Sequence, residues 1–223
     1  DGDANFGQLL VLVAANELVD LVGRAGDFFH RCLVVVVAMH GLEGLVPEHG
    51  GIGALCVTEA AGSMAPTLED KIDIAQNAID LARALGLAQP KVAILAAVET
   101  VSSHMPSTTE AAALCKMADR GQIRGGLLDG PLAMDNAISK VAAKIKNIKS
   151  EVAGDADILL VPDLEAGNIL AKQLTFMANA DAAGIVLGAK VPIILTSRAD
   201  SERTKLASVA VALLLAASRR QIQ

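Results

Sequence analysis

The feature that most constrains the fold of this chain is a series of short apolar runs, each ending in glycine or polar residues. The clearest series lies between Asp157 and Arg198. Its runs show no polar alternation, which is typical of strands covered on both faces. These runs are Ile158–Val161, Gly184–Leu187 and Val191–Leu195. We therefore expect a sheet that is buried between layers of helices.

The same pattern extends towards the N-terminus, where apolar runs alternate with helical periodicity. Further strands are predicted at Leu33–Ala38, Ala54–Thr58, Lys91–Val98 and Ile123–Leu128. Helices are predicted at Phe6–Val22, Leu68–Leu85, Glu110–Arg120, Ala133–Lys146 and Leu164–Met177, with a last one through Val209–Ala217. Thr67 with Asp70 resembles a capping box, and Asp163 is a candidate N-cap. This alternation predicts an α/β fold with mostly parallel sheets and flanking helices.

Composition excludes several classes of function. The 223 residues carry a net charge of -6, which argues against binding to the phosphate backbone of nucleic acids. There is no Trp or Tyr and there are only four Phe, so the aromatic platforms of single-strand binders are missing as well.

Cysteine, histidine and hydropathy indicate the setting in which the protein works. The three cysteines (Cys32, Cys56 and Cys115) have no CxxC spacing, which favours free thiols in a reducing compartment. The four histidines show no metal-ligand spacing, so no metal site is predicted. No apolar run is long enough to span a membrane and no signal peptide is evident. A cytoplasmic protein without membrane association is therefore expected.

The polar residues after the last predicted strand form the first candidate site. Thr196, Ser197 and Arg198 follow the run ending at Leu195, and open α/β sheets bind ligands at the carboxyl ends of their strands. The guanidinium of Arg198 presents a fork of donors that matches phosphate oxygens, and Ser197 adds a hydroxyl. Two alternatives stay open. The segment could be a capped helix with a surface arginine, and Asp200 could be either a catalytic base or the N-cap of the next helix.

A second candidate site follows the predicted strand Ile123–Leu128. Gly130 would permit a close backbone approach, while Asp129 could accept hydrogen bonds from loop amides or orient Arg198. With Pro131, these residues also form a sequence that favours an ordinary strand-to-helix turn. The pattern alone leaves both interpretations open.

Three segments resemble one family. They read DGPLAMDNAIS at Asp129–Ser139, VAGDADILLVPDLEAGN at Val152–Asn168 and LTSRADS at Leu195–Ser201. Together they closely resemble the phosphate acetyltransferase and phosphate butyryltransferase family, with the butyryl-type branch the better fit. A similar module is also found fused to the C-terminal side of a hydratase domain. The likeness extends over about Thr58–Ala216 and is weak before that.

The resemblance implies a fold and a division of the chain. Members have two α/β lobes with a cleft, an architecture like that of isocitrate and isopropylmalate dehydrogenases. Residues 1–128 would belong to the first lobe and the crossover, 129–190 to the lobe on the coenzyme A side, and 191–223 would return to the first lobe. The resemblance also favours a homodimer or a larger homo-oligomer.

The resemblance further implies an activity. Members move an acyl group between coenzyme A and phosphate, so we expect an acetyl or butyryl transferase that works by direct thiolate attack on the acyl phosphate in a ternary complex. Coenzyme A, acyl-CoA, phosphate and acyl phosphate are then substrates, and no tightly bound cofactor is expected. The alternative is a non-catalytic module that binds coenzyme A or acyl phosphate.

By the same resemblance, Ser197 and Arg198 are the catalytic pair, with Asp200 as a possible base, and Thr196 joins Asp129, Gly130 and Pro131 in binding substrate. The resemblance assigns the Gly167 region to coenzyme A; Asn168, Lys172 and Gly188 complete that candidate set. The chain departs from the family at Thr58–Ser63, where Glu59 replaces an aspartate. Another departure is Thr204, which stands near the position where acetyl-type members of the family carry the aspartate thought to take the thiol proton.

Overall fold

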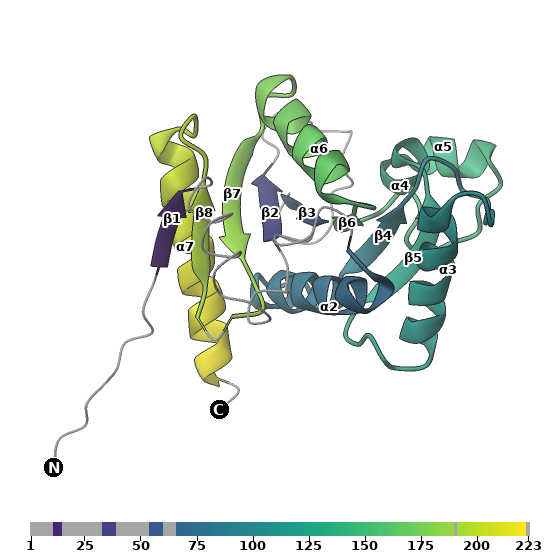
Figure 1. The fold of residues 1–223 in the computed structure, drawn as a ribbon, viewed down its shortest axis with the longest axis horizontal. Helices are drawn as coiled ribbons and strands as arrows, with labels where there is room; N and C mark the ends of the chain where they lie inside the picture. The colour runs from purple at the N-terminus through teal and green to yellow at the C-terminus, as the bar shows by residue number, and fades with distance from the viewer. Residues whose placement is uncertain (1–10, 15–32, 39–53, 60–65, 190, 222–223) are drawn as a thin grey trace, which may run out of the picture.

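The computed structural model describes residues 11–14, 33–38, 54–59, 66–189 and 191–221 (Figure 1). Its strands form one eight-stranded sheet in the order β1-β8-β7-β2-β3-β6-β4-β5. The strands are β1 (Val11–Ala14), β2 (Leu33–Ala38), β3 (Ala54–Glu59), β4 (Lys91–Leu95), β5 (Leu127–Leu132), β6 (Ile158–Leu160), β7 (Asp181–Val186) and β8 (Ile193–Thr196). The helices are α2 (Leu68–Ala84), α3 (Pro106–Asp119), α4 (Met134–Ile138), α5 (Lys140–Ile145), α6 (Leu164–Phe176) and α7 (Glu202–Gln221).

The α/β class is confirmed, and the sheet itself is mixed. Four of its seven neighbouring pairs are parallel, and the antiparallel ones surround β2 and β7. Antiparallel neighbours can be joined by a short loop, whereas parallel ones need a crossover. Only residues 187–192 separate β7 from β8, too few for a helix, and the two strands do pair antiparallel.

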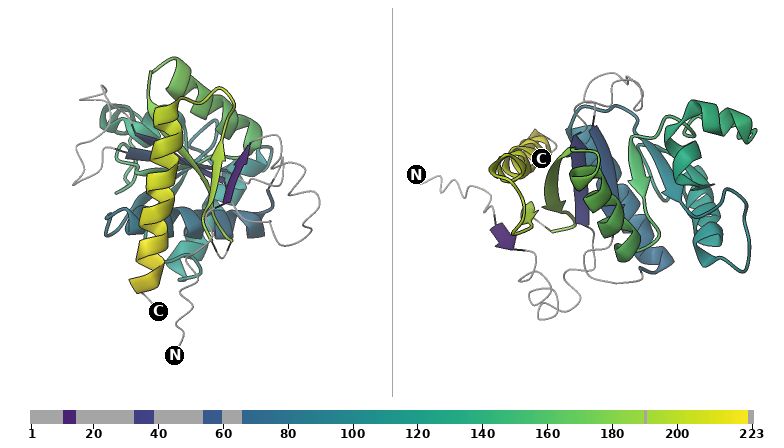
Figure 2. Two further views of the ribbon diagram at one scale, coloured as in Figure 1. Left: turned by 90° about the vertical axis from the view of Figure 1, so that its left-hand side faces the viewer. Right: turned by 90° about the horizontal axis from the view of Figure 1, so that it is seen from above.

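The two faces of the sheet carry separate hydrophobic cores, because successive side chains of a strand point to opposite faces. In β6, Ile158 and Leu160 join the core that also contains residues of α2, α3 and α7. Leu159 between them joins the core shared with α4 and α6. The strands at the centre of the sheet are therefore apolar on both faces, as the unbroken runs predicted. Figure 2 shows these helices lying on either side of the strands.

Local sequence signals place two helix starts correctly. Thr67 and Asp70 form the predicted capping box of α2, and the side chain of Asp163 accepts a hydrogen bond from the amide of Ala166 at the start of α6. The helix predicted at Ala133–Lys146 is divided at Ser139, whose side chain caps α5. Among the described residues, no helix is both long and apolar enough to cross a bilayer.

Two predictions are wrong. Val11–Ala14 forms β1 beside β8, although a helix was expected there; the rest of Phe6–Val22 lies outside the described residues. The strand expected at Ile123–Leu128 is instead β5, which continues through Asp129 to Leu132. Because β5 has a single neighbour, its edge tolerates glycine and proline that would end a central strand.

Candidate functional site

The chain makes a tight polar turn after β8, which we call the β8 corner (Thr196–Ser201). The amide of Ser197 donates to Oδ2 of Asp200 at 2.5 Å, and the amide of Asp200 donates back to the carbonyl oxygen of Ser197 at 3.1 Å. The amide of Ala199 donates to Oγ of Ser197 at 3.3 Å. These three bonds hold the turn closed.

Arg198 is exposed, and among the described residues it has no acidic partner. The neighbouring arginine differs, because Arg203 forms an ion pair with Asp181 at 2.8 Å. An arginine bound to a carboxylate has part of its donor capacity occupied, whereas one without such a partner keeps all five donors for a ligand. Within the described part of the chain, Arg198 is therefore the better placed of the two to receive a phosphate.

Ser201 provides the cap of α7. Its Oγ accepts a hydrogen bond from the amide of Thr204 at 3.1 Å, three residues on, which is the geometry of an N-cap. The alternative in which Asp200 caps this helix is therefore wrong. The carboxylate of Asp200 serves the turn itself by accepting from Ser197.

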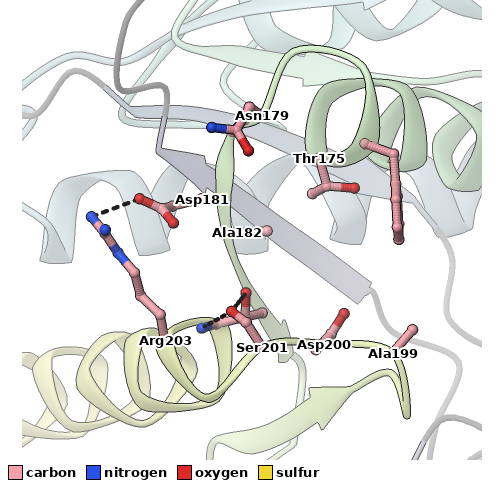
Figure 3. A pocket seen from close by; sticks show the side chains of 11 residues that line it. Thr175, Asn179, Asp181, Ala182, Ala199, Asp200, Ser201 and Arg203 are labelled. Carbon is pink, nitrogen blue, oxygen red and sulfur yellow. Dashed lines mark hydrogen bonds and ion pairs between the residues drawn. The ribbon is translucent and has the colours of Figure 1, made fainter.

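A cavity of about 580 Å³ lies beside the β8 corner. It is bounded by the end of α6, the start of β7, the corner and the first turn of α7, and Figure 3 shows the labelled side chains around this space. Its lining residues are Thr175, Phe176, Asn179, Ala180, Asp181, Ala182, Ala199, Asp200, Ser201, Arg203 and Thr204. Within the described residues, no group of His, Cys, Asp or Glu side chains is arranged to hold a metal ion.

The Asp129–Pro131 segment lies far from this corner. It belongs to β5 at one edge of the sheet, and β8 is six positions away in the strand order. At about 4.8 Å per strand, that separation is about 29 Å. Oδ1 of Asp129 accepts from the amide of Gly130 at 2.8 Å, within its own segment. The idea that Asp129 orients Arg198 is therefore wrong, and so is the interpretation of these residues as a turn.

The absence of a side chain at Gly130 has a packing reason. A Cβ built on this residue would lie 2.8 Å from both Cβ and the carbonyl oxygen of Ile94 in β4. The absence of a side chain at Gly130 thus allows β4 to pack close to β5. Cys115 also points here, with Sγ 3.6 Å from the carbonyl oxygen of Gly130, and burial is the main cause that raises the pKa of this thiol to about 12.

Gly130→Ala is accordingly expected to destabilise the fold by about 2 kcal/mol, as overpacking typically does. The loss should appear in urea unfolding as a lower midpoint with an unchanged slope. If the variant were as stable as the parent but weaker for a substrate, the glycine would instead serve ligand approach.

The residues assigned to coenzyme A divide into two groups. Gly167 is buried in α6, while Asn168 and Lys172 are exposed on it, and the last turn of this helix lines the cavity. Gly188 follows the far end of β7, whose first residues are the ones that line the cavity. Because β7 and β8 run antiparallel, the carboxyl end of each strand lies beside the amino end of the other. The last turn of α6 thus lies near the corner, whereas Gly167 and Asn168 lie in the first turns of that helix and Gly188 lies at the far end of β7.

Three residues of this region, Asn179, Asp181 and Arg203, did not emerge from the sequence. Asp181 is the first residue of β7. A polar residue before an apolar run is typical of a loop, so the sequence predicts this strand only from Gly184. Arg203 gains its place by pairing with Asp181 across the cavity. Nothing in the sequence around an arginine at a helix start indicates which distant carboxylate it will pair with.

Comparison with known proteins gives a consistent picture. Residues 35–213 match the model of the family described as phosphate acetyl/butaryl transferase. The chain is 66% identical over 178 residues to a phosphate acetyltransferase of Rhizobium meliloti, covering 80% of this chain and 56% of that protein. It is 48% identical over 165 residues to a phosphate butyryltransferase of Clostridium acetobutylicum, covering 74% of this chain and 55% of that protein. The chain thus spans about half the length of these relatives.

Solved structures agree on the fold. The crystal structure of a branched-chain phosphotransacylase from Enterococcus faecalis superposes with a TM-score of 0.72 at 34% identity, covering 83% of this chain and 63% of that one. A phosphotransacetylase from Streptococcus pyogenes gives a TM-score of 0.69 over 86% of this chain and 56% of that one. At 23% identity, this second likeness concerns the fold alone.

Proposed function

The chain belongs to the phosphate acetyl/butyryl transferase family, and on that premise we propose that it transfers an acetyl or butyryl group between coenzyme A and inorganic phosphate. The observation that supports this most strongly is the β8 corner. There the Ser197–Asp200 hydrogen bonds hold an exposed Arg198 without an acidic partner among the described residues.

The proposed reaction is a direct transfer in a ternary complex. The thiolate of coenzyme A attacks the carbonyl carbon of the acyl phosphate, the C–S bond forms, and the carbonyl electrons move onto oxygen. When the carbonyl re-forms, the C–O bond to phosphorus-bound oxygen breaks and inorganic phosphate leaves with that electron pair. In this scheme Arg198 binds the phosphate and balances the charge that grows on it as it leaves. No acyl-enzyme is needed, so Ser197 is not a nucleophile.

Ser197 contributes a hydroxyl in this scheme. Its Oγ accepts from the amide of Ala199, so its own hydrogen is available to a phosphate or carbonyl oxygen. The thiol proton needs no dedicated carboxylate, because a free thiol has a pKa of about 8.5 and a nearby guanidinium lowers it. Asp200 then acts as a positioning residue through the amide of Ser197.

Two variants of Asp200 separate positioning from base catalysis. An asparagine side chain still offers an oxygen to the Ser197 amide, so Asp200→Asn is expected to keep kcat within about threefold of the parent. Asp200→Ala leaves that amide without its acceptor and should lower kcat about tenfold, since one hydrogen bond to a charged group is worth about 1.5 kcal/mol or more. Steady-state kinetics over pH 6 to 9 gives the comparison. Asparagine as damaging as alanine would mean that Asp200 takes the proton.

The assay that tests the proposed function measures thiol release from acetyl-CoA and butyryl-CoA, with and without inorganic phosphate. We expect release that requires phosphate. Acetyl and butyryl differ by two methylenes, each worth about 1–3 kcal/mol, so we expect kcat/KM to differ at least about tenfold between the two substrates. Calorimetric binding of coenzyme A without any phosphate-dependent release would overturn the proposal.

A further inference from the structure

A second cavity, of about 420 Å³, lies between the last turns of α2 and α7. It is at the end of α7 opposite the β8 corner (Figure 1). Arg219 at this end is 17 residues beyond Glu202, and a rise of about 1.5 Å per residue separates the two by about 26 Å. The lining residues are Asp80, Arg83, Ala84, Gly86, Leu87, Ala88, Leu215, Ser218 and Arg219. This cavity is therefore distinct from the one beside the β8 corner.

Two arginines line the second cavity, and neither forms an ion pair with a described residue. Arg83 is exposed and packs over Gly125, where an added Cβ would lie 2.8 Å from Nη1 of the arginine. Arg219 is half-buried and donates from Nη1 to the carbonyl oxygen of Ala189 at 3.1 Å. Because a guanidinium has five donors, both arginines keep most of theirs for a ligand.

Arginines in the last turn of a helix often serve the helix itself, by binding its free carbonyl oxygens. At the end of α2 these oxygens have backbone partners instead. The amide of Gly86 donates to the carbonyl oxygen of Arg83, and the amide of Leu87 donates to that of Ala82, each at 3.0 Å. The side chain of Arg83 is thus not needed to satisfy the end of its own helix.

The other lining residues define the kind of anion that fits. Asp80 is the one acid among the described lining residues, so two arginines and one aspartate give the lining a formal charge of +1. A doubly charged phosphate would be repelled by that carboxylate, whereas a singly charged group balances the lining. Leu87 is half-buried and Leu215 is buried, so part of the wall is apolar. An acid with a short aliphatic chain meets both conditions.

We propose that this cavity binds a small aliphatic monocarboxylate, with its carboxylate held by Arg83 and Arg219. Its chain then lies against Leu87 and Leu215, and the half-buried Ser218 adds a hydroxyl donor. The fork of a guanidinium matches the two oxygens of a carboxylate, and the cavity volume is within the usual range for small-molecule sites. Because the two arginines belong to different helices, the bound acid joins the end of α2 to the end of α7. This site does not depend on the proposed function.

The first test uses three probes with the full chain. Hexanoate, acetate and hexylammonium are titrated at low ionic strength, where charged contacts are least screened, and Kd is measured by NMR. We expect hexanoate to bind at least about tenfold more tightly than acetate, because its longer chain is buried against the apolar wall. Hexylammonium has a similar chain with the opposite charge and should bind far more weakly. Equal binding of hexylammonium, or no binding of hexanoate, would overturn the assignment.

The second test changes the arginines one at a time. Arg83→Gln and Arg219→Gln should each weaken hexanoate binding about tenfold, since each removes charged hydrogen bonds to the carboxylate. Arg220→Gln is the matched control, because Arg220 is an exposed neighbour in α7 that does not line the cavity. Arg83 is exposed and has no ion pair with a described residue, so its variant should keep the parent's melting temperature. An unchanged Kd in Arg83→Gln, or an equal loss in Arg220→Gln, would contradict the site.

A further variant separates this site from the β8 corner. Arg198→Ala should bind hexanoate as tightly as the parent, because Arg198 does not line the second cavity. Loss of hexanoate binding in that variant would assign the acid to the β8 corner and overturn the second site. The titrations contain neither coenzyme A nor phosphate. A chain that shows the expected differences but releases no thiol therefore contradicts the proposed reaction alone.

Discussion

Arg198→Ala is expected to lower kcat/KM for acyl transfer at least about 100-fold while the protein stays folded. Removing one preorganised donor to a developing negative charge typically costs this much or more. The fold should be unaffected, because Arg198 is exposed and forms no ion pair with a described residue. Phosphate-dependent thiol release measures the first effect, and the melting temperature checks the second.

Two further variants control this prediction. Arg198→Lys keeps a positive charge without the planar fork, so it should recover part of the activity. Arg220→Ala removes an exposed arginine from the last turn of α7 and should leave activity unchanged. Activity of Arg198→Ala within threefold of the parent would exclude this arginine from the reaction.

Gly184→Ala is expected to destabilise the fold by about 3 kcal/mol. Gly184 lies in β7 against β8, and a Cβ added to it would overlap the carbonyl oxygen of Leu195. Backbone moves much less readily than the end of a flexible side chain, so the two strands would have to separate or shift. For a chain of this size the melting temperature should fall by about 6–12 °C.

The same substitution should also impair activity. The pairing of β7 with β8 sets the position of Thr196 and hence of the β8 corner, because the corner begins where that strand ends. Gly86→Ala is the matched control. Gly86 has a φ of +107° but open space around its missing side chain, so only backbone strain applies and a loss of about 1 kcal/mol is expected. Equal losses in the two variants would show that the β7–β8 contact is not the cause.

Much of the fold follows from local physical chemistry. Unbroken apolar runs identify strands that are covered on both faces, and β6 shows why, since Leu159 faces one core while Ile158 and Leu160 face the other. The capping box at Thr67 and the cap at Asp163 give two helix starts to the residue. β5 was misplaced because Asp129 and Gly130 are typical turn residues, yet an edge strand accommodates them.

The candidate site depends more than the fold does on contacts between residues far apart in the sequence, and local sequence patterns do not predict such contacts. Asp200 and Ser201 are both good capping residues, and only the observed bonds show that Ser201 caps α7 while Asp200 closes the corner. The cavity brings together α6, β7 and α7, and the ion pair of Asp181 with Arg203 joins two of these elements. Similarly, the distance between Asp129 and Arg198 follows from the strand order, which short motifs do not specify.

The most direct test of the central claim is a crystal structure of this chain with inorganic phosphate. We expect a phosphate at the β8 corner, with its oxygens about 2.7–2.9 Å from guanidinium nitrogens of Arg198, as in other charged hydrogen bonds of this kind. A phosphate ordered elsewhere, with Arg198 directed into solvent, would contradict the claim.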